Sequence, residues 1–344
     1  MSIAILGYGT VGSGSFYFLN ANRERIHKRT GVHINVKWIF DLKGQLDDTA
    51  QKHLTHDIKD VLDDTDVTVI IECMGGIEPA YTYVKSALLK GKSVVTSNKE
   101  LVASRGGELL AIAKANSVNF LFEASVGGGI PIILPLEQSL MLDDISQITG
   151  ILNGTTNYIL TNIESRGVSY SEALKEAQEH GFAELNPSAD VDGFDTCRKL
   201  AILLSLTLGK QVDFNDIPTM GISQITPDDF VLASHKNKTI KLLGVAAIDG
   251  SRLSARVAPF MIDLHHPLAN IYNEYNAISV TGKLAGNMMF YGKGAGKLPT
   301  AAAIITDVVM CVRHPDKFIG RGWGLEKHLV SPFECEKIGG MFVC

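Results

Sequence analysis

The chain has 344 residues, of which 45% are hydrophobic and 20% are charged, and its formal net charge is −5. This length accommodates two domains, each with its own core. The mild negative charge excludes the basic footprint of a nucleic-acid-binding protein, and no Lys/Arg stripe indicates a membrane surface. No apolar run is long enough to span a bilayer, and the N-terminus lacks the features of a signal peptide. These properties predict a globular protein of ordinary composition.

The cysteines indicate the redox compartment. Their number is odd, no pair has CxxC spacing, and the histidines show no metal-ligand spacing. This pattern argues against a disulfide framework or a structural zinc site and predicts a reducing, cytoplasmic location. Two cysteines near the C-terminus could pair or link subunits, but we expect free, inert thiols. The five are Cys73, Cys197, Cys311, Cys335 and Cys344.

A glycine-rich turn follows the first apolar run. Ser2–Leu6 has the pattern of a buried parallel strand, and a helical stretch to about Arg29 follows the turn. Glycines in the pattern GxGxxG allow a tight turn and bring a pyrophosphate close to the helix N-terminus. We therefore predict a dinucleotide site; a glycine turn without a nucleotide is the weaker alternative in this context. Its predicted contacts are Gly7, Gly9, Thr10, Val11 and Gly12.

The end of the second strand bears on the choice of cofactor. Strand Asn35–Phe40 is followed by Asp41, whose carboxylate can accept hydrogen bonds from the adenosine ribose, as in NAD sites. Lys43 could instead meet a 2′-phosphate. The cofactor is thus NAD or NADP, and Asp41 favours NAD.

Strands and helices continue to alternate up to about residue 122. This alternation predicts an α/β fold with a Rossmann-type, doubly wound parallel sheet that binds ligands at the carboxyl ends of its strands. Ser97 and Lys99 follow one such end. Lys99 could be a solvated residue at the start of a helix. Its position at the ligand-binding edge of the sheet agrees at least as well with a contact to the cofactor or the substrate. The elements predicted here are strands Val67–Glu72, Ser93–Thr96 and Val118–Phe122 and helix Pro79–Lys90.

A glycine-rich segment, Glu123–Pro131, indicates the crossing to a second domain. Successive glycines leave backbone carbonyls free to converge, and together with Glu123 they could coordinate a hard cation through oxygen. A flexible hinge is the simpler interpretation of the segment.

The remaining pattern predicts an α+β domain with its own sheet. Strand Gln147–Leu152 leads into the polar turn Asn153–Asn157, which could hold a small polar substrate or only cap a helix. A capping box predicts helix Ser169–His180. Apolar runs within residues 239–257 and 278–281 predict further strands, and helix Ala301–Val312 suits a return to the first domain. The predicted divisions are 1–130 for the dinucleotide-binding domain, 131–292 for the substrate-binding and dimerisation domain, 293–325 for the return segment and 326–344 for a tail.

Charge is concentrated between Glu184 and Lys199, where four carboxylates and two cations occur in sixteen residues. Pro187 and Gly193 predict an irregular lead-in to a helix that Asp195 is placed to cap. Asp195 and Lys199 are four residues apart and share one helical face. The spacing alone favours an exposed ion pair. The alternative is a cleft in which carboxylates control the proton of a lysine.

Taken together and in this order, several motifs resemble the homoserine dehydrogenase family over Ile3 to about Val309. They are GYGTVG at 7–12, SNKE at 97–100, EASVGGGIPII at 123–133, GILNGTTNYIL at 150–160, GFAELNPSADVDGFDTCRKL at 181–200 and GKGAGKLPTAA at 292–302.

The resemblance implies a reaction and a role for individual residues. The family reduces L-aspartate 4-semialdehyde to L-homoserine with NADH or NADPH, and catalyses the reverse oxidation, in threonine and methionine biosynthesis. Lys199 would donate the proton to the aldehyde oxygen, where a fixed cation also stabilises developing charge. Lys99 would assist beside the nicotinamide and the substrate. The other implied residues are Glu184 and Asp195 on the substrate ammonium, Asp190 in support of the lysines, Gly154 and Thr155 along the substrate, and Ser97, Lys99 and Gly294 at the cofactor.

The resemblance also implies a sodium or other monovalent cation site. Glu123 and the backbone carbonyls of Val126, Gly128 and Ile130 match the ligands of the family. A homodimer built on the sheet of the second domain is expected as well.

Two departures from the family pattern matter. Many members have a basic residue where this chain has Phe40, and its absence strengthens the preference for NAD. Only about twenty residues follow Gly324, too few for the threonine-sensing domain of many members, so feedback inhibition through such a domain is not expected.

Three other activities compete with this assignment. The chain could be another nicotinamide-dependent reductase of a small amino-acid aldehyde or imine. A phosphorylating semialdehyde dehydrogenase would need a nucleophilic cysteine, for which Cys73 is the candidate. A nucleotide sensor without catalysis would not need Lys99, Glu184, Asp195 and Lys199.

Overall fold

The computed structural model describes residues 1–42, 44, 46–320, 322–338 and 340–343, which form two compact units. The first contains the described residues of Met1–Glu137, Leu208–Gln211 and Ala295–Glu326, and the other described residues form the second. No helix in these ranges is long and apolar enough to cross a membrane.

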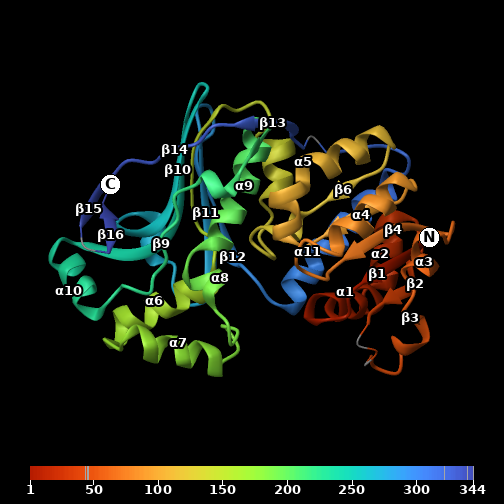
Figure 1. Cartoon of the computed structure of the whole chain (residues 1–344), viewed down its shortest axis with the longest axis horizontal. Helices are drawn as coiled ribbons and strands as arrows, with labels where there is room; N and C mark the ends of the chain where they lie inside the picture. The colour runs from red at the N-terminus through yellow and green to blue at the C-terminus, as the bar shows by residue number, and fades with distance from the viewer. Residues whose placement is uncertain (43, 45, 321, 339, 344) are drawn as a thin grey trace. The chain divides into compact units, whose positions relative to one another are not determined.

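The first unit is built on a six-stranded sheet with the order β3-β2-β1-β4-β5-β6, in which every neighbouring pair is parallel (Figure 1). The strands are short apolar runs, and β1 is buried from Ile3 to Leu6. The strand order reverses between β1 and β4, which is where doubly wound sheets bind their ligands. The predicted Rossmann-type fold is therefore confirmed. The strands are β1 (Ser2–Leu6), β2 (Asn35–Phe40), β3 (Leu54–Thr55), β4 (Val67–Glu72), β5 (Ser93–Thr96) and β6 (Phe120–Leu121).

Helices pack on this sheet, and the last of them comes from the far end of the chain. Helix α11 supplies Ile304, Ile305 and Val308 to the same core as Ile3 and Ile5 of β1. Its start lies so close to α1 that a Cβ on Gly14 would be 2.8 Å from the carbonyl oxygen of Lys297. The helices are α1 (Thr10–Ala21), α2 (Arg23–Thr30), α3 (Ile58–Leu62), α4 (Ala80–Leu89), α5 (Lys99–Ala115) and α11 (Lys297–Arg313), with short helical turns at Gln51–His53, Glu123–Ser125 and Pro135–Ser139.

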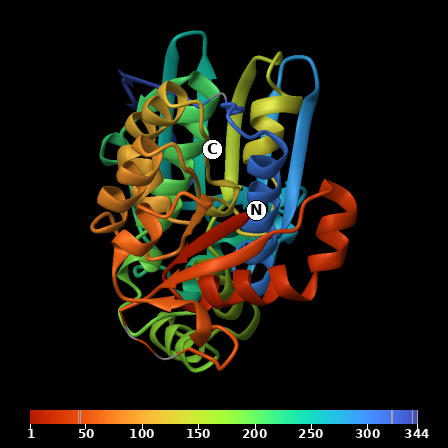
Figure 2. The same ribbon diagram turned by 90° about the vertical axis from the view of Figure 1, so that its right-hand side faces the viewer.

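The second unit has a separate mixed sheet, ordered β12-β11-β7-β9-β10-β16-β15, with β14 also paired to β10. Figure 2 shows the light-blue hairpin of β11 and β12 beside β7, with which β11 pairs antiparallel. The predicted α+β domain with its own sheet is therefore confirmed. The strands are β7 (Ile145–Ile151), β9 (Lys238–Asp249), β10 (Arg252–Asp263), β11 (Tyr275–Gly282), β12 (Gly286–Lys293), β14 (Ser331–Pro332), β15 (Glu336–Ile338) and β16 (Met341–Val343).

Helices of the second unit, and the turns next to them, carry the residues predicted to bind the substrate. A close contact fixes α9 against the sheet, because Gly244 of β9 lies beside the side chains of Leu200 and Thr196. The helices are α6 (Gly154–Arg166), α7 (Tyr170–Glu179), α8 (Ser188–Val191), α9 (Phe194–Leu208) and α10 (Pro227–His235), with short turns at Phe214–Asp216 and Pro267–Asn270; β8 (Lys210–Val212) and β13 (Gly324–His328) form a separate pair.

Several predicted boundaries were wrong for local reasons. The helical stretch predicted to about Arg29 is present and ends at Thr30, although Asn22 divides it into α1 and α2. The strand predicted at Val118–Phe122 is reduced to Phe120–Leu121: the backbone N–H of Asn119 donates to the Ser93 hydroxyl, and Phe122 already turns into the short helix at Glu123–Ser125. The last helix begins at Lys297 rather than Ala301.

The C-terminal segment is more structured than its sequence indicated. Strand β16 adds to β10 in parallel, pairing Phe342 with Phe260. The expectation of a free thiol is wrong for Cys335, which is disulfide-bonded, whereas Cys73, Cys197 and Cys311 are free. Cys344 lies outside the described residues.

Candidate active site

The glycine turn after β1 has the geometry of a dinucleotide site. Gly7 has φ +89°, and a Cβ on Gly12 would lie 2.0 Å from the Gly7 carbonyl oxygen, so a side chain would force the turn apart. A Cβ on Gly9 would meet no atom within 4 Å, which leaves that side open to a ligand. Helix α1 starts directly afterwards, at Thr10 and Val11, and no side chain caps it. Its first N–H groups therefore remain available for an anion.

Asp41 stands where the sequence predicts a ribose contact. Its Oδ2 accepts a hydrogen bond from the backbone N–H of Tyr8 at 2.7 Å, which ties the end of β2 to the glycine turn. Both border a cavity of about 480 Å³, together with Gly7, Gly9 and Leu42. The open glycine face, the uncapped helix and this carboxylate fit a dinucleotide.

Phe40 bears on the recognition of a 2′-phosphate. Its side chain is only 3% exposed, and its ring packs edge-on against the Tyr83 ring, with the ring centroids 5.7 Å apart. The alternative phosphate contact, Lys43, lies outside the described residues. No basic side chain among the described residues lines the cavity.

A buried carboxylate organises the loops that carry Ser97 and Lys99. Glu72, at the end of β4, accepts hydrogen bonds from the Thr96 hydroxyl at 2.5 Å and from the Met74 backbone at 2.7 Å. Thr96 in turn accepts the backbone N–H of Asn98, which caps α5 just before Lys99. Burial raises the pKa of the Glu72 carboxyl, and these hydrogen bonds oppose the rise. Sequence reasoning missed Glu72 because it looks like the last residue of an apolar strand.

Glu123 is buried in the first unit. Its carboxylate accepts hydrogen bonds from the backbone N–H groups of Ile132, Ile133 and Leu134 at 2.7–2.9 Å, and burial raises its pKa. Its own N–H donates to the carboxylate of Asp307, whose pKa burial raises well above the usual value.

The residues around Glu123 fit an oxygen-coordinated cation. Among the described residues, no hydrogen bond reaches the carbonyl oxygens of Val126, Gly128 or Ile130, and the buried Ser125 hydroxyl has no partner. Buried oxygens in this situation match the preference of hard cations. No group of three or more His, Cys, Asp or Glu side chains in the described part of the chain is arranged to hold a metal.

A buried polar cluster forms in the second unit around Lys199. Its Nζ donates to Oδ2 of Asp195 at 2.6 Å and to the Leu152 carbonyl at 2.7 Å. Asn153 donates to the same Oδ2 at 2.9 Å and to Oδ1 of Asp190 at 2.7 Å. Three segments that are separate in the sequence are therefore joined by one network.

Burial decides between the two interpretations of the Asp195–Lys199 spacing. Asp195 is 1% exposed and Lys199 7% exposed, so the exposed ion pair favoured by spacing alone is wrong. A buried pair of this kind is costly to desolvate and is weak evidence for stability. Asp190 belongs to the short helix α8 rather than to an irregular lead-in.

Asn153 is the residue of this cluster that sequence reasoning missed. Its Oδ1 accepts the backbone N–H of Thr156 and caps α6, while its Nδ2 bridges the two carboxylates. An amide suits both tasks because it carries an acceptor and two donors. The N-cap signal was visible in the sequence, but the bridge depends on distant residues.

The other predicted site residues lie at the start of α6, on the turn after α7 and after β12. Gly154 begins α6, and a Cβ there would be 2.7 Å from the Glu274 carbonyl oxygen. Thr155 is buried and donates its hydroxyl to the Phe182 carbonyl at 2.6 Å. Glu184 is exposed on the turn after α7. Gly294 is the last residue of one segment of the second unit. The Asn276 amide occupies the space that a side chain at Gly294 would need.

Cys73 does not have the environment of a nucleophile. Burial raises the pKa of its thiol, and the neighbouring Glu72 carboxylate raises it further. A catalytic cysteine requires the opposite shift. The phosphorylating alternative therefore lacks its nucleophile.

Comparisons with known proteins agree along most of the chain. A family model described as homoserine dehydrogenase matches residues 131–309, and one described as homoserine dehydrogenase, NAD binding domain, matches residues 7–123. A homoserine dehydrogenase of Bacillus subtilis (strain 168) is 42% identical over 339 residues, covering 96% of this chain and 78% of that protein.

Solved structures give the same result. A homoserine dehydrogenase from Thiobacillus denitrificans has a TM-score of 0.89 at 36% identity, covering 98% of this chain and 80% of that one. A hyperthermophilic archaeal homoserine dehydrogenase in complex with NADPH has a TM-score of 0.76 at 25% identity, covering 90% of this chain and 97% of that one. The chain therefore belongs to the homoserine dehydrogenase family, oxidoreductases that act on CH–OH groups and use a nicotinamide cofactor.

Proposed function

We propose that the chain reduces L-aspartate 4-semialdehyde to L-homoserine, with NADH preferred over NADPH, and that Lys199 is the proton donor. This step would supply homoserine for threonine and methionine biosynthesis. The observation that carries the proposal is the buried pair of Lys199 and Asp195. A desolvated ammonium beside a carboxylate needs a function, because replacing such a pair with apolar residues is often neutral or stabilising.

In the proposed chemistry, Lys199 supplies a proton to the aldehyde oxygen and stabilises the charge that develops there. A fixed cationic donor is most effective where water is excluded. Asp195 holds the Nζ in place, and the Leu152 carbonyl accepts a second hydrogen bond from it. The same lysine would accept the proton in the reverse oxidation. A bound nicotinamide supplies or accepts the hydride.

Carboxylates of the second unit would recognise the amino-acid part of the substrate. Glu184 and Asp195 are proposed to bind its ammonium group, and Asp190 supports the cluster through Asn153. Gly154 and Thr155 would lie along the substrate at the start of α6, where backbone N–H groups favour a carboxylate.

The glycine turn and Asp41 would hold the cofactor in the first unit, and Ser97 and Lys99 would contact it from the loop after β5. Gly294 is proposed as a further cofactor contact. The preference for NADH is supported by the buried Phe40 ring and by Asp41 at the edge of the cavity.

A sodium or other monovalent cation is proposed at Glu123 with the carbonyls of Val126, Gly128 and Ile130. The three backbone N–H groups on the Glu123 carboxylate would orient it and oppose the rise in its pKa that burial causes. Thermal melts in NaCl, KCl and choline chloride at equal ionic strength test the site. A higher melting temperature with one alkali cation supports it, and identical melts oppose it.

The proposed assembly is a homodimer built on the sheet of the second unit. Edge strand β12 exposes Met289 by 44% and Tyr291 by 55%, and exposed apolar side chains of this kind favour association. Light scattering after gel filtration should give the mass of two chains; the mass of one chain would contradict the proposal.

A reducing, cytoplasmic location is proposed as well. It is supported by the free thiols of Cys73, Cys197 and Cys311, and the disulfide at Cys335 counts against it. Fractionation of the host cell against a cytoplasmic marker enzyme would decide the question.

The test of the reaction is NADH oxidation with L-aspartate 4-semialdehyde. Lys199→Ala should lower kcat by about 10²–10⁴-fold, the usual contribution of general acid catalysis, while the Kd for NADH stays within about twofold of wild type. Lys210→Ala, which removes an exposed lysine paired with Glu326, is the control. An inactive wild type that binds NADH would overturn the function, and an active Lys199→Ala would overturn the role of the lysine.

A further inference from the structure

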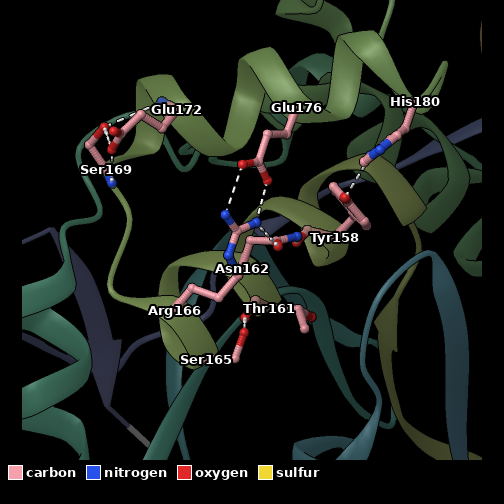
Figure 3. A network of polar contacts seen from close by, with 9 residues as sticks. All are labelled: Tyr158, Thr161, Asn162, Ser165, Arg166, Ser169, Glu172, Glu176 and His180. Atoms are coloured by element: carbon pink, nitrogen blue, oxygen red, sulfur yellow. Dashed lines mark hydrogen bonds and ion pairs between the residues drawn. The ribbon is translucent and has the colours of Figure 1, made fainter.

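Two rows of side chains join α6 to α7 in the second unit (Figure 3). Tyr158 and Arg166 of α6 face α7, where they meet His180, the C-cap residue of that helix, and Glu176 respectively. Both terminal guanidinium nitrogens of Arg166 donate hydrogen bonds to the Glu176 carboxylate, at 2.5 and 2.9 Å. The Tyr158 hydroxyl bonds to Nδ1 of His180 at 3.0 Å. The helix pair is thus fastened at two separate points.

The turn after α7, residues 181–184, is seated on the Tyr158–His180 contact. The Phe182 ring packs against the Tyr158 ring with centroids 4.7 Å apart. The Phe182 carbonyl accepts the hydroxyl of buried Thr155 at 2.6 Å. At the end of the turn, the Glu184 carbonyl accepts a hydrogen bond from Gln178 of α7 at 3.0 Å. The turn is therefore held between the start of α6 and the end of α7.

This turn carries or fixes two of the residues proposed to bind substrate. Glu184 is on it, and the hydroxyl of Thr155 is oriented by its Phe182 carbonyl. Glu184 itself is exposed. The direction of its carboxylate therefore depends on the backbone of the turn, and so on what holds that backbone.

We propose that Tyr158 and His180 are positioning residues for the substrate site: their hydrogen bond holds the Tyr158 ring under Phe182, and thereby sets the places of Glu184 and the Thr155 hydroxyl. The inference rests on the proposed function, because it assigns a substrate-recognition role to the turn. Tyr158 and His180 would act through Phe182 and need not touch the substrate. Their effect should fall on recognition of the substrate ammonium and not on proton transfer.

The Arg166–Glu176 contact provides a matched control. Arg166 and Glu176 join the same two helices but contact neither Phe182 nor Thr155 in any hydrogen bond or ring contact. Arg166→Ala should loosen the helix pair without displacing the turn. Any effect shared by both points would reflect only the stability of the hairpin.

The kinetic test compares two aldehydes in Tyr158→Phe, His180→Ala and Arg166→Ala. Succinate semialdehyde is the substrate aldehyde without its ammonium group, so it does not need Glu184. Tyr158→Phe and His180→Ala should each raise KM for L-aspartate 4-semialdehyde about tenfold with kcat within about twofold, the signature of lost uniform binding. Their kcat/KM for succinate semialdehyde should fall by a smaller factor, because this aldehyde has no ammonium group for Glu184 to bind but can still contact Thr155. The double variant should be no worse than His180→Ala, which removes the hydrogen bond and also the ring contacts of His180 with Tyr158 and Phe182.

Hydrogen exchange provides a readout that needs no substrate. The amides of Phe182 and Ala183 both donate to the Ala177 carbonyl, and they should exchange faster in Tyr158→Phe and His180→Ala but not in Arg166→Ala. The inference is overturned if Arg166→Ala raises KM or the exchange rate as much as the other two, or if Tyr158→Phe changes neither. A wild type that does not reduce the aldehyde would refute the proposed function, and the exchange measurement would still decide whether the pair positions the turn.

Discussion

The two units gather their polar groups by opposite means. In the first, a glycine turn offers backbone N–H groups at the start of α1, and the residues that shape it are neighbours in the sequence. In the second, the cluster around Lys199 is made of side chains from three separate segments. A backbone site therefore depends on a few glycines, whereas a side-chain cluster depends on each of its members.

The largest effect is expected from Asp195→Ala. Removing one partner leaves the Lys199 ammonium buried without its carboxylate, which costs about 3–5 kcal/mol of unfolding free energy. Activity should fall at least about 10²-fold, since the proton donor loses its support. Urea unfolding and NADH oxidation measure the two effects.

Asp195→Asn is the control for this prediction, because the amide oxygen can still accept a hydrogen bond from Lys199. It should recover part of the stability and little of the activity. If Asp195→Ala is as stable as wild type, the cluster is not the interdependent unit described above.

The second prediction contrasts two glycines of the cofactor turn. Gly12→Ala places a Cβ 2.0 Å from the Gly7 carbonyl oxygen, so it should lower Tm and weaken NADH binding about 100-fold or more. Gly9→Ala meets no atom of the chain within 4 Å and should leave Tm unchanged. It should nevertheless weaken NADH binding about tenfold, because a pyrophosphate must approach that face.

Differential scanning fluorimetry and NADH fluorescence titration separate the two glycines. Normal NADH binding by Gly9→Ala would refute the approach of the pyrophosphate to the open face. Both variants should leave the Lys199 cluster intact, since it belongs to the other unit.

A second buried lysine, Lys241, provides a comparison for the pairing of Lys199 with Asp195. Lys241 is 0% exposed; its Nζ donates to the Ile271 carbonyl at 2.9 Å and lies 4.5 Å from the centroid of the Tyr272 ring. Among the residues that the structure describes, no side-chain carboxylate is hydrogen-bonded to it, and burial lowers its pKa to about 8. Because the pKa is lower in the folded state, the unfolded chain binds more protons between about pH 8 and pH 10.4, and stability should rise with pH in that window.

Lys241→Met should remove this pH dependence. Between pH 7 and pH 10.5, the unfolding free energy of wild type should rise relative to that of the variant by on the order of 2–3 kcal/mol, at about 1.4 kcal/mol per pKa unit. Urea unfolding of both proteins across this range gives the difference directly. Parallel curves would show that Lys241 titrates normally.

The smallest predicted effect concerns the choice between NADH and NADPH. Leu42 is 72% exposed and borders the cavity beside Asp41. Leu42→Arg should lower the Kd for NADPH by about three- to tenfold, because a guanidinium can pair with the 2′-phosphate. The Kd for NADH should not change. Leu42→Ala is the control, and equal gains for both cofactors would indicate nonspecific attraction.

The first site was predictable because its pattern is contiguous. A strand, a GxGxxG turn and a helix follow one another, and Asp41 ends the next strand, so local rules give both the elements and the ligand edge. Glu72 was not predicted, because a carboxylate at the end of a buried strand does not change the periodic pattern of the sequence.

The second site could be located but not understood from its residues. A spacing of four between Asp195 and Lys199 is the same on an exposed helix as in a buried cluster. Burial, which separates the two, depends on how α6, α8 and α9 pack. The bridging role of Asn153 could not be predicted for the same reason, since its two carboxylates lie 37 and 42 residues away.

The sequence alone determined the parallel sheet, the cofactor turn and the family, because these follow from local periodicity, glycine placement and ordered motifs. Tertiary structure alone decided that Lys199 is buried against Asp195, that Asn153 joins the carboxylates and that the last strands complete the second sheet. These features depend on desolvation and on contacts between distant segments. Both arise only when the chain is packed.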